Sequence, residues 1–123
     1  MANALQIVQK YHHSTVNGTD EWKTLLAEDV VFQGPMNKVK GRKAYIELGG
    51  IFFSMVRNYR LLHNLDSKNL AAIEGYYTAM TPSGKTVTLE MAEFYEVKMG
   101  RIKSIRIYFD AEEFRREFAA TGS

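Results

Sequence analysis

The chain has 123 residues and a formal net charge of +2; 46% of its residues are hydrophobic and 12% are aromatic. This length predicts one domain over residues 1–123 that buries about two thirds of its unfolded surface, and so many aromatic residues argue against disorder. Because cysteine is absent, a disulfide framework and a thiol nucleophile are excluded.

The segment from Met1 to Lys10 lacks a basic region followed by an apolar core, so we expect no signal peptide. The longest apolar stretch, 51–56, is too short to span a bilayer. We therefore expect a cytoplasmic protein with no membrane partner. The small net charge and the lack of a recognisable DNA- or RNA-binding motif predict no nucleic-acid partner.

The first half of the chain is predicted to be mainly helical. Residues at helical spacing precede an Asn17-Gly18 stop signal: Leu5, Val8, Tyr11, His12 and Thr15. A short helix follows Asp20, a strand covers 29–32, and a third helix begins near Gly41. Gly49-Gly50 within the third helix costs about 2 kcal/mol against alanine, which indicates a break or close packing there.

The second half is predicted to be a meander of strands. They cover Tyr59–Asp66, Leu70–Met80, Thr86–Val97 and Arg101–Phe109, with turn residues between them. Asp110 then caps a last helix, with Glu113 three residues on. The fold class is therefore α+β: a curved antiparallel sheet wrapped by three helices of the N-terminal half, with a short C-terminal helix. Such a cup can hold a small molecule.

The turns predict which strand residues point into the cup. A three-residue loop at 98–100 pairs Glu93 with Ile105. One face then collects the apolar residues Val87, Leu89, Met91, Tyr95, Ile105, Ile107 and Phe109. A symmetric turn across 82–85 places Glu74 opposite Glu93 and Tyr76 opposite Met91. His63 shares that face if Asp66 pairs with Asn69.

Two facing carboxylates are typical of an acid–base site. In an apolar lining Glu74 and Glu93 cannot both ionise readily, so one would stay protonated while the other acts as a base. The alternative, that each glutamate pairs with a nearby cation or lies at a wet rim, stays open. No His and carboxylate spacing predicts a metal site, and no dinucleotide glycine motif is present, so we expect neither metal nor cofactor.

The other face of these strands is mixed in character. It carries Thr86, Thr88, Glu90, Phe94, Glu96, Ser104, Arg106 and Tyr108. Phe94 and Tyr108 are costly to leave bare, so this face is either solvated or a subunit interface.

The order of these elements and several motifs resemble the nuclear transport factor 2-like superfamily. The similar segments are 26–35, 39–42, 81–85, 100–102 and 108–110. This superfamily includes ketosteroid isomerase, limonene epoxide hydrolase and the SnoaL-like polyketide cyclases. The resemblance implies a cone-shaped α+β barrel with a deep apolar pocket, commonly a homodimer through the outer face of the sheet.

The catalytic residues of those relatives are matched only in part. The charged pair of limonene epoxide hydrolase falls at Glu74 and Tyr76, and its second Asp falls at Ile107, so its set is absent. The base of ketosteroid isomerase falls at Gly34, whereas its hydrogen-bond-donating Asp falls at Glu93. The helix-one Tyr of that enzyme falls near Tyr11 or His12.

We therefore predict a pocket for a small, mostly apolar molecule. It would belong to a cofactor-independent acid–base enzyme of isomerase, cyclase or dehydratase type, with Glu93 as acid or base, Glu74 as its coupled partner and Tyr76 as a donor. The predicted lining comprises Tyr11, Phe32, Phe52, Met55, His63, Met91, Tyr95, Ile105 and Ile107. The alternatives are a non-catalytic ligand-binding module and a dimeric interaction domain whose pocket is filled by side chains.

Overall fold

The computed structural model describes residues 3–118, so both ends of the predicted domain, 1–2 and 119–123, lie outside the described residues. The helices are α1 (Ala4–Asn17), α2 (Glu21–Thr24), α3 (Arg42–Phe53) and α4 (Ala111–Phe118). The strands are β1 (Leu26–Gln33), β2 (Lys38–Lys40), β3 (Val56–Ser67), β4 (Leu70–Met80), β5 (Thr86–Lys98) and β6 (Arg101–Tyr108). No helix among these is long and apolar enough to cross a bilayer.

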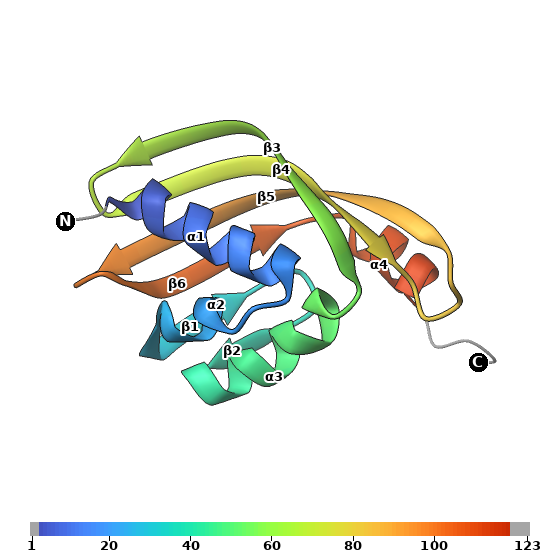
Figure 1. The fold of residues 1–123 in the computed structure, drawn as a ribbon, viewed down its shortest axis with the longest axis horizontal. Coiled ribbons are helices and arrows are strands. Elements are labelled where there is room, and N and C mark those ends of the chain that lie inside the picture. Colours follow the sequence, from blue (N-terminus) through green and yellow to red (C-terminus); the bar gives the residue numbers. More distant parts are fainter. Residues whose placement is uncertain (1–2, 119–123) are drawn as a thin grey trace.

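The α+β class is confirmed. The strands form a six-stranded sheet in the order β2-β1-β6-β5-β4-β3. Of its pairs, β1–β6 is parallel and the others are antiparallel, so the curved sheet is mixed. α1 crosses the strands from β3 to β6, α3 lies beside β1 and β2, and α4 lies where β4 and β5 are joined (Figure 1).

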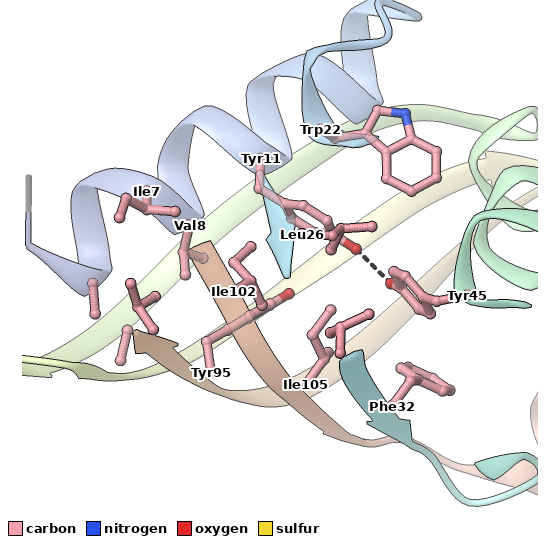
Figure 2. Close-up of a cluster of buried hydrophobic side chains, with 14 of the residues drawn as sticks. Ile7, Val8, Tyr11, Trp22, Leu26, Phe32, Tyr45, Tyr95, Ile102 and Ile105 are labelled. Atoms are coloured by element: carbon pink, nitrogen blue, oxygen red, sulfur yellow. Dashed lines mark hydrogen bonds between the residues drawn. The ribbon is translucent and has the colours of Figure 1, made fainter. Parts of the chain in front are cut away.

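α1 has clear signals at both ends. At its start the side chains and backbone N–H groups of Asn3 and Gln6 bond each other reciprocally at 2.9 Å, and it ends at Gly18, which has φ +71°. Its buried face includes Ile7, Val8 and Tyr11, which pack with β1 and β6 in the main hydrophobic core (Figure 2).

α3 continues through Gly49-Gly50 without a break. A Cβ at Gly49 would lie 3.2 Å from the Phe53 ring, whereas one at Gly50 would meet nothing within 4 Å. Close packing therefore accounts for the first glycine. The helix ends at Phe53, and Val56 begins β3, three residues earlier than the predicted strand start.

The β5–β6 hairpin has the predicted faces but not the predicted pairing. Its turn has two residues, Met99 and Gly100, both at positive φ. An irregularity beyond Val97 then restores the alternation, so Glu93 lies opposite Ile107 instead of Ile105. Glu93 consequently points to the inner face, as predicted.

The predicted β4–β5 pairing is wrong by one residue. The Thr81 N–H bonds the Lys85 carbonyl at 2.8 Å, and Gly84 at φ +87° closes a three-residue loop instead of a four-residue one. Glu93 therefore lies opposite Ile73, and Tyr77 takes the inner position assigned to Tyr76. Because side chains alternate along a strand, every residue of β4 exchanges faces with its neighbour.

Candidate functional site

A cavity of about 270 Å³ lies between α3, α4 and the inner face of the sheet. Its lining is almost wholly apolar and rich in aromatic side chains: Tyr11, Phe32, Met36, Asn37, Tyr45, Leu48, Gly49, Ile51, Phe52, Phe53, Met55, Tyr77, Met91, Glu93, Ile105, Ile107, Phe109, Phe114 and Phe118. Glu93 is the one carboxylate among these lining residues. An open cavity argues against the alternative of an interaction domain whose pocket is filled by side chains.

Glu93 is buried in the cavity wall, with 2% of its surface exposed. Its Oε1 accepts a hydrogen bond from the Tyr95 hydroxyl at 2.5 Å and lies 3.3 Å from Nε2 of His12. Its Oε2 has no hydrogen-bond partner within residues 3–118. A buried carboxylate oxygen without a partner is costly, and Oε2 is the unused acceptor of this carboxylate.

His12 reaches this carboxylate from α1, 81 positions earlier in the chain. Its ring is stacked on Tyr59 of β3 with centroids 4.2 Å apart, and it meets Tyr77 and Tyr95 edge-on. The Tyr59 hydroxyl is buried and, like Oε2 of Glu93, has no partner among the described residues. One aromatic cluster therefore surrounds the acid.

Three phenols of the cavity can donate hydrogen bonds. The Tyr11 and Tyr45 hydroxyls lie 2.5 Å apart (dashed line in Figure 2), so one donates to the other and a single hydrogen of the pair is left over. Burial raises the pKa of Tyr11, Tyr45 and Tyr77 above the usual value, and the nearby charge of Glu93 adds to the effect. These phenols stay protonated at neutral pH.

Most of the predicted lining residues do lie in the cavity wall. They are Tyr11, Phe32, Phe52, Met55, Met91, Ile105 and Ile107, together with Glu93. Tyr95 is buried behind the wall, where it bonds Glu93.

Three predicted site residues lie away from the cavity, and this corrects the prediction. Glu74 is exposed on the outer face of β4, and Tyr76 shares that face because of the shortened loop. His63 is also exposed, and its Nδ1 lies 2.8 Å from Glu74 Oε1. The facing pair of glutamates does not form.

Several residues of the site were not among the predicted site residues. Tyr45 is at an apolar position of the third predicted helix, and that periodicity was a usable signal for it. A three-residue loop between β4 and β5 would have placed Tyr77 on the inner face, so the correct loop length would have predicted it. The contact between His12 and Glu93 had no local signal, because it depends on how α1 crosses the sheet.

The site combines a buried carboxylate, hydrogen-bond-donating phenols and an apolar enclosure. That combination suits binding of a small molecule and proton transfer to or from it. No group of three or more His, Cys, Asp or Glu side chains in residues 3–118 is arranged to hold a metal ion.

An α+β cone with an apolar cavity between sheet and helices defines a class of small-molecule pocket folds. The model of the SnoaL-like domain matches residues 8–105, so the chain belongs to the SnoaL-like domain family, and the predicted resemblance is confirmed. No curated protein matches the chain.

Solved structures share this fold across nearly the whole chain. A nuclear transport factor 2-like protein of unknown function from Burkholderia pseudomallei K96243 is 20% identical, with 98% of this chain and 100% of that chain covered and a TM-score of 0.79. A proposed SnoaL-like polyketide cyclase from Jannaschia sp. CCS1 is 13% identical, with 95% of this chain and 92% of that chain covered and a TM-score of 0.79. TerC, co-crystallised with polyporic acid, is 13% identical, with 97% and 100% covered and a TM-score of 0.80. The TM-scores show a common fold, and at these identities the likeness shows the fold alone.

Proposed function

We propose that this chain binds a small, mainly apolar molecule in the cavity and moves a proton to or from it with Glu93, without a cofactor. The observation that supports this most directly is a buried carboxylate with an unpartnered oxygen in an otherwise apolar wall. Isomerisation, cyclisation and dehydration each include such a proton transfer. TerC, which has the same fold, was co-crystallised with polyporic acid, and this agrees with a cavity for small organic molecules.

The proposed step needs only residues of the cavity wall. Glu93 removes a proton from a carbon next to a ligand carbonyl, and negative charge then develops on the carbonyl oxygen. Tyr77 and the spare hydrogen of the Tyr11–Tyr45 pair stabilise that charge by hydrogen bonding. The apolar enclosure strengthens these interactions because it excludes water.

Exchange of hydrogen for deuterium tests the role of Glu93 before a natural substrate is known. The protein is incubated in D₂O with a panel of small cyclic and aryl ketones, and ¹H NMR follows loss of the signal beside the carbonyl. We expect catalysed exchange with at least one ketone, and a decrease of about 10²-fold or more in Glu93→Gln. Glu74→Gln is the matched control and should exchange at the wild-type rate. Equal rates for wild type and Glu93→Gln would contradict the proposal.

A second pair of variants tests the phenol. Tyr77→Phe removes a donor in the cavity wall, whereas Tyr76→Phe changes the neighbouring residue on the outer face. We expect exchange to fall by about 10²-fold in Tyr77→Phe, the usual cost of a lost oxyanion donor, and to be unchanged in Tyr76→Phe. The reverse order would mean that Tyr77 does not stabilise the developing charge.

Ligand binding without turnover is a second candidate. It is favoured because Glu93 is the one carboxylate in the wall. The resemblance to limonene epoxide hydrolase also implies that Ile107 takes the place of an acid of that enzyme. In that case ketones would shift NMR signals of cavity residues, while their own exchange would match the rate in buffer.

We propose that two copies of the chain form a homodimer through the outer face of the sheet. A hollow of about 610 Å³ there includes Phe94 and Tyr108, which are 47% and 51% exposed. Sedimentation analysis should give twice the chain mass for wild type and the chain mass for Phe94→Glu. Met99→Glu, in the exposed β5–β6 turn, should remain dimeric. A monomeric wild type would contradict this proposal.

A further inference from the structure

Three polar atoms meet behind the cavity wall. The Tyr95 hydroxyl lies 2.5 Å from Glu93 Oε1, His12 Nε2 lies 3.2 Å from that hydroxyl, and His12 Nε2 lies 3.3 Å from Oε1. The contacts form a triangle in which each atom touches the other two. All three residues are buried.

Counting hydrogens in this triangle assigns the protonation of His12. The Tyr95 hydroxyl has one hydrogen, and the short contact to an ionised Glu93 uses it. The hydroxyl oxygen and Oε1 can then only accept a hydrogen bond from Nε2. Nε2 of His12 therefore carries a hydrogen, and the neutral ring has its lone pair on Nδ1.

The opposite nitrogen of the ring, Nδ1, points away from the triangle of contacts that Nε2 makes. In residues 3–118, the buried side-chain atoms cut off from both solvent and partners are the Tyr59 hydroxyl and Glu93 Oε2. Among the described residues Nδ1 of His12 has no hydrogen-bond partner, and 7% of the His12 surface is exposed, so we place the entry of water at this side of the ring. His12 is also not part of the cavity lining. Its ring thus connects Glu93 with water behind the wall.

The side chains that contact His12 come from β5, β3, β4 and α1 itself. On β5 they are Glu93 and Tyr95, on β3 Tyr59, on β4 Tyr77, and on α1 the neighbouring Tyr11. Among these contacts Glu93 supplies the one carboxylate, and the others are phenols. His12 and Glu93 therefore form an imidazole–carboxylate pair enclosed by phenols.

We propose that His12 is the positioning residue through which Glu93 exchanges protons with solvent. A proton from water binds Nδ1 while Nε2 passes its hydrogen to Glu93 Oε1. Glu93 becomes a neutral carboxylic acid, and His12 stays neutral with its hydrogen on Nδ1. The reverse transfer returns the carboxylate and releases one proton to water. A half-turn of the carboxyl group presents the acquired hydrogen to a ligand.

NMR of the whole protein tests this without a substrate. Histidine is labelled with ¹⁵N and glutamate with ¹³C, and the Glu93 carboxyl signal is assigned from its loss in Glu93→Gln. We expect neutral His12 to be protonated on Nε2, Nδ1 to gain the proton on acidification, and the Glu93 signal to shift at the same midpoint. A neutral ring with a bare Nε2 while Glu93 is ionised, or a Glu93 signal that does not respond as His12 gains its Nδ1 proton, would overturn the proposal.

Variants separate proton exchange from simple packing. His12→Gln keeps an N–H donor but cannot accept a proton from water. The Glu93 carboxyl signal of this variant should therefore lose the shared step, which is the shift at the midpoint where His12 gains its Nδ1 proton in the wild type. His13→Gln alters the adjacent exposed histidine, which contacts Asn17, and should keep that step. If the step persists in His12→Gln, the proposal is wrong; if this variant does not fold, the wild-type titration alone decides.

This inference rests on the proposed role of Glu93, yet the two can fail separately. Glu93→Gln with full ketone exchange would remove the catalytic role and leave the NMR titration of His12 and Glu93 as it is. If the NMR titration shows no shared midpoint for His12 and Glu93, the proposed proton route is wrong. The dependence of ketone deuterium exchange on Glu93 would still stand.

Discussion

At the scale of single residues, Gly75 shows how closely the site is packed. A Cβ at this position on β4 would lie 2.4 Å from the Arg60 carbonyl oxygen and 2.6 Å from the Tyr59 hydroxyl. The missing side chain lets the Tyr59 phenol lie over β4, where its ring stacks on His12. The glycine is thus a requirement of the aromatic cluster around Glu93.

We expect Gly75→Ala to lower the free energy of unfolding by about 1–3 kcal/mol, the usual cost of overpacking. Gly50→Ala is the control, because its Cβ meets nothing within 4 Å, and in a helix it should stabilise by up to about 1 kcal/mol. Urea unfolding measures both. Wild-type stability in Gly75→Ala would show that β3 moves aside without cost.

At the scale of elements, α4 is the most loosely held part of the cavity wall. None of its residues is fully buried. Phe114 and Phe118 stack with centroids 4.6 Å apart and line the cavity, while Lys85 Nζ contacts Glu117 Oε2 at 2.8 Å from the β4–β5 loop. A helix held by so few contacts opens at a lower free energy than the sheet.

The cap of α4 should control that opening. The Asp110 side chain accepts a hydrogen bond from the Glu113 N–H at 3.0 Å, as predicted from the sequence. We expect Asp110→Ala to cost about 1 kcal/mol of helix stability, which raises hydrogen exchange in α4 about fivefold and leaves the β5 amides unchanged. Arg115→Ala, on the exposed side of the same helix, should exchange as wild type. Unchanged α4 exchange in Asp110→Ala would mean that the cap does not limit opening.

At the scale of the whole molecule, the buried phenols make stability depend on alkaline pH. Burial is the main reason that the pKa values of Tyr11, Tyr45, Tyr59, Tyr77 and Tyr95 lie above the usual value. The unfolded chain loses these phenolic protons near pH ~10, whereas the folded chain keeps them. Stability is therefore complete below pH ~10 and falls as the pH rises further.

Each buried tyrosine should contribute a slope of about 1.4 kcal/mol per pH unit above pH ~10. Urea unfolding between about pH 9 and 11 measures the total slope. Tyr77→Phe should reduce it by about one tyrosine, and Tyr108→Phe, exposed on the outer face, should leave it unchanged. A Tyr77→Phe slope equal to wild type would contradict the raised pKa.

Features that depend on neighbouring residues in the sequence were predicted, whereas features that depend on contacts between distant segments were not. Periodicity, turn residues and the Asp110 cap are local, and they predicted the α+β class and the order of the elements other than the short strand β2. The inner position of Glu93 was also predicted, because the shorter β5–β6 turn and the irregularity beyond Val97 offset each other. Glu74 and Tyr76 were misplaced because one loop residue decides the face of a whole strand.

The rest of the site depends on long-range packing. His12 and Glu93 meet only because α1 crosses the sheet at a particular position. The place of Tyr59 depends on an irregularity in β3 and on the space over Gly75. No spacing within either segment carries that information.

The parallel pairing of β1 with β6 determines when the cavity can form during folding. Leu26 pairs with Ile102, and Phe32 pairs with Ile105. Although β1 is synthesised early, it therefore cannot pair with β6 until β6 has also been synthesised. The β3–β4–β5 hairpins can form beforehand, since their contacts are close in sequence. Phe32, Ile105 and Ile107 then complete the wall together. Because closing this long loop costs more chain entropy than forming the hairpins, we expect it to limit the rate of folding and to precede ligand binding.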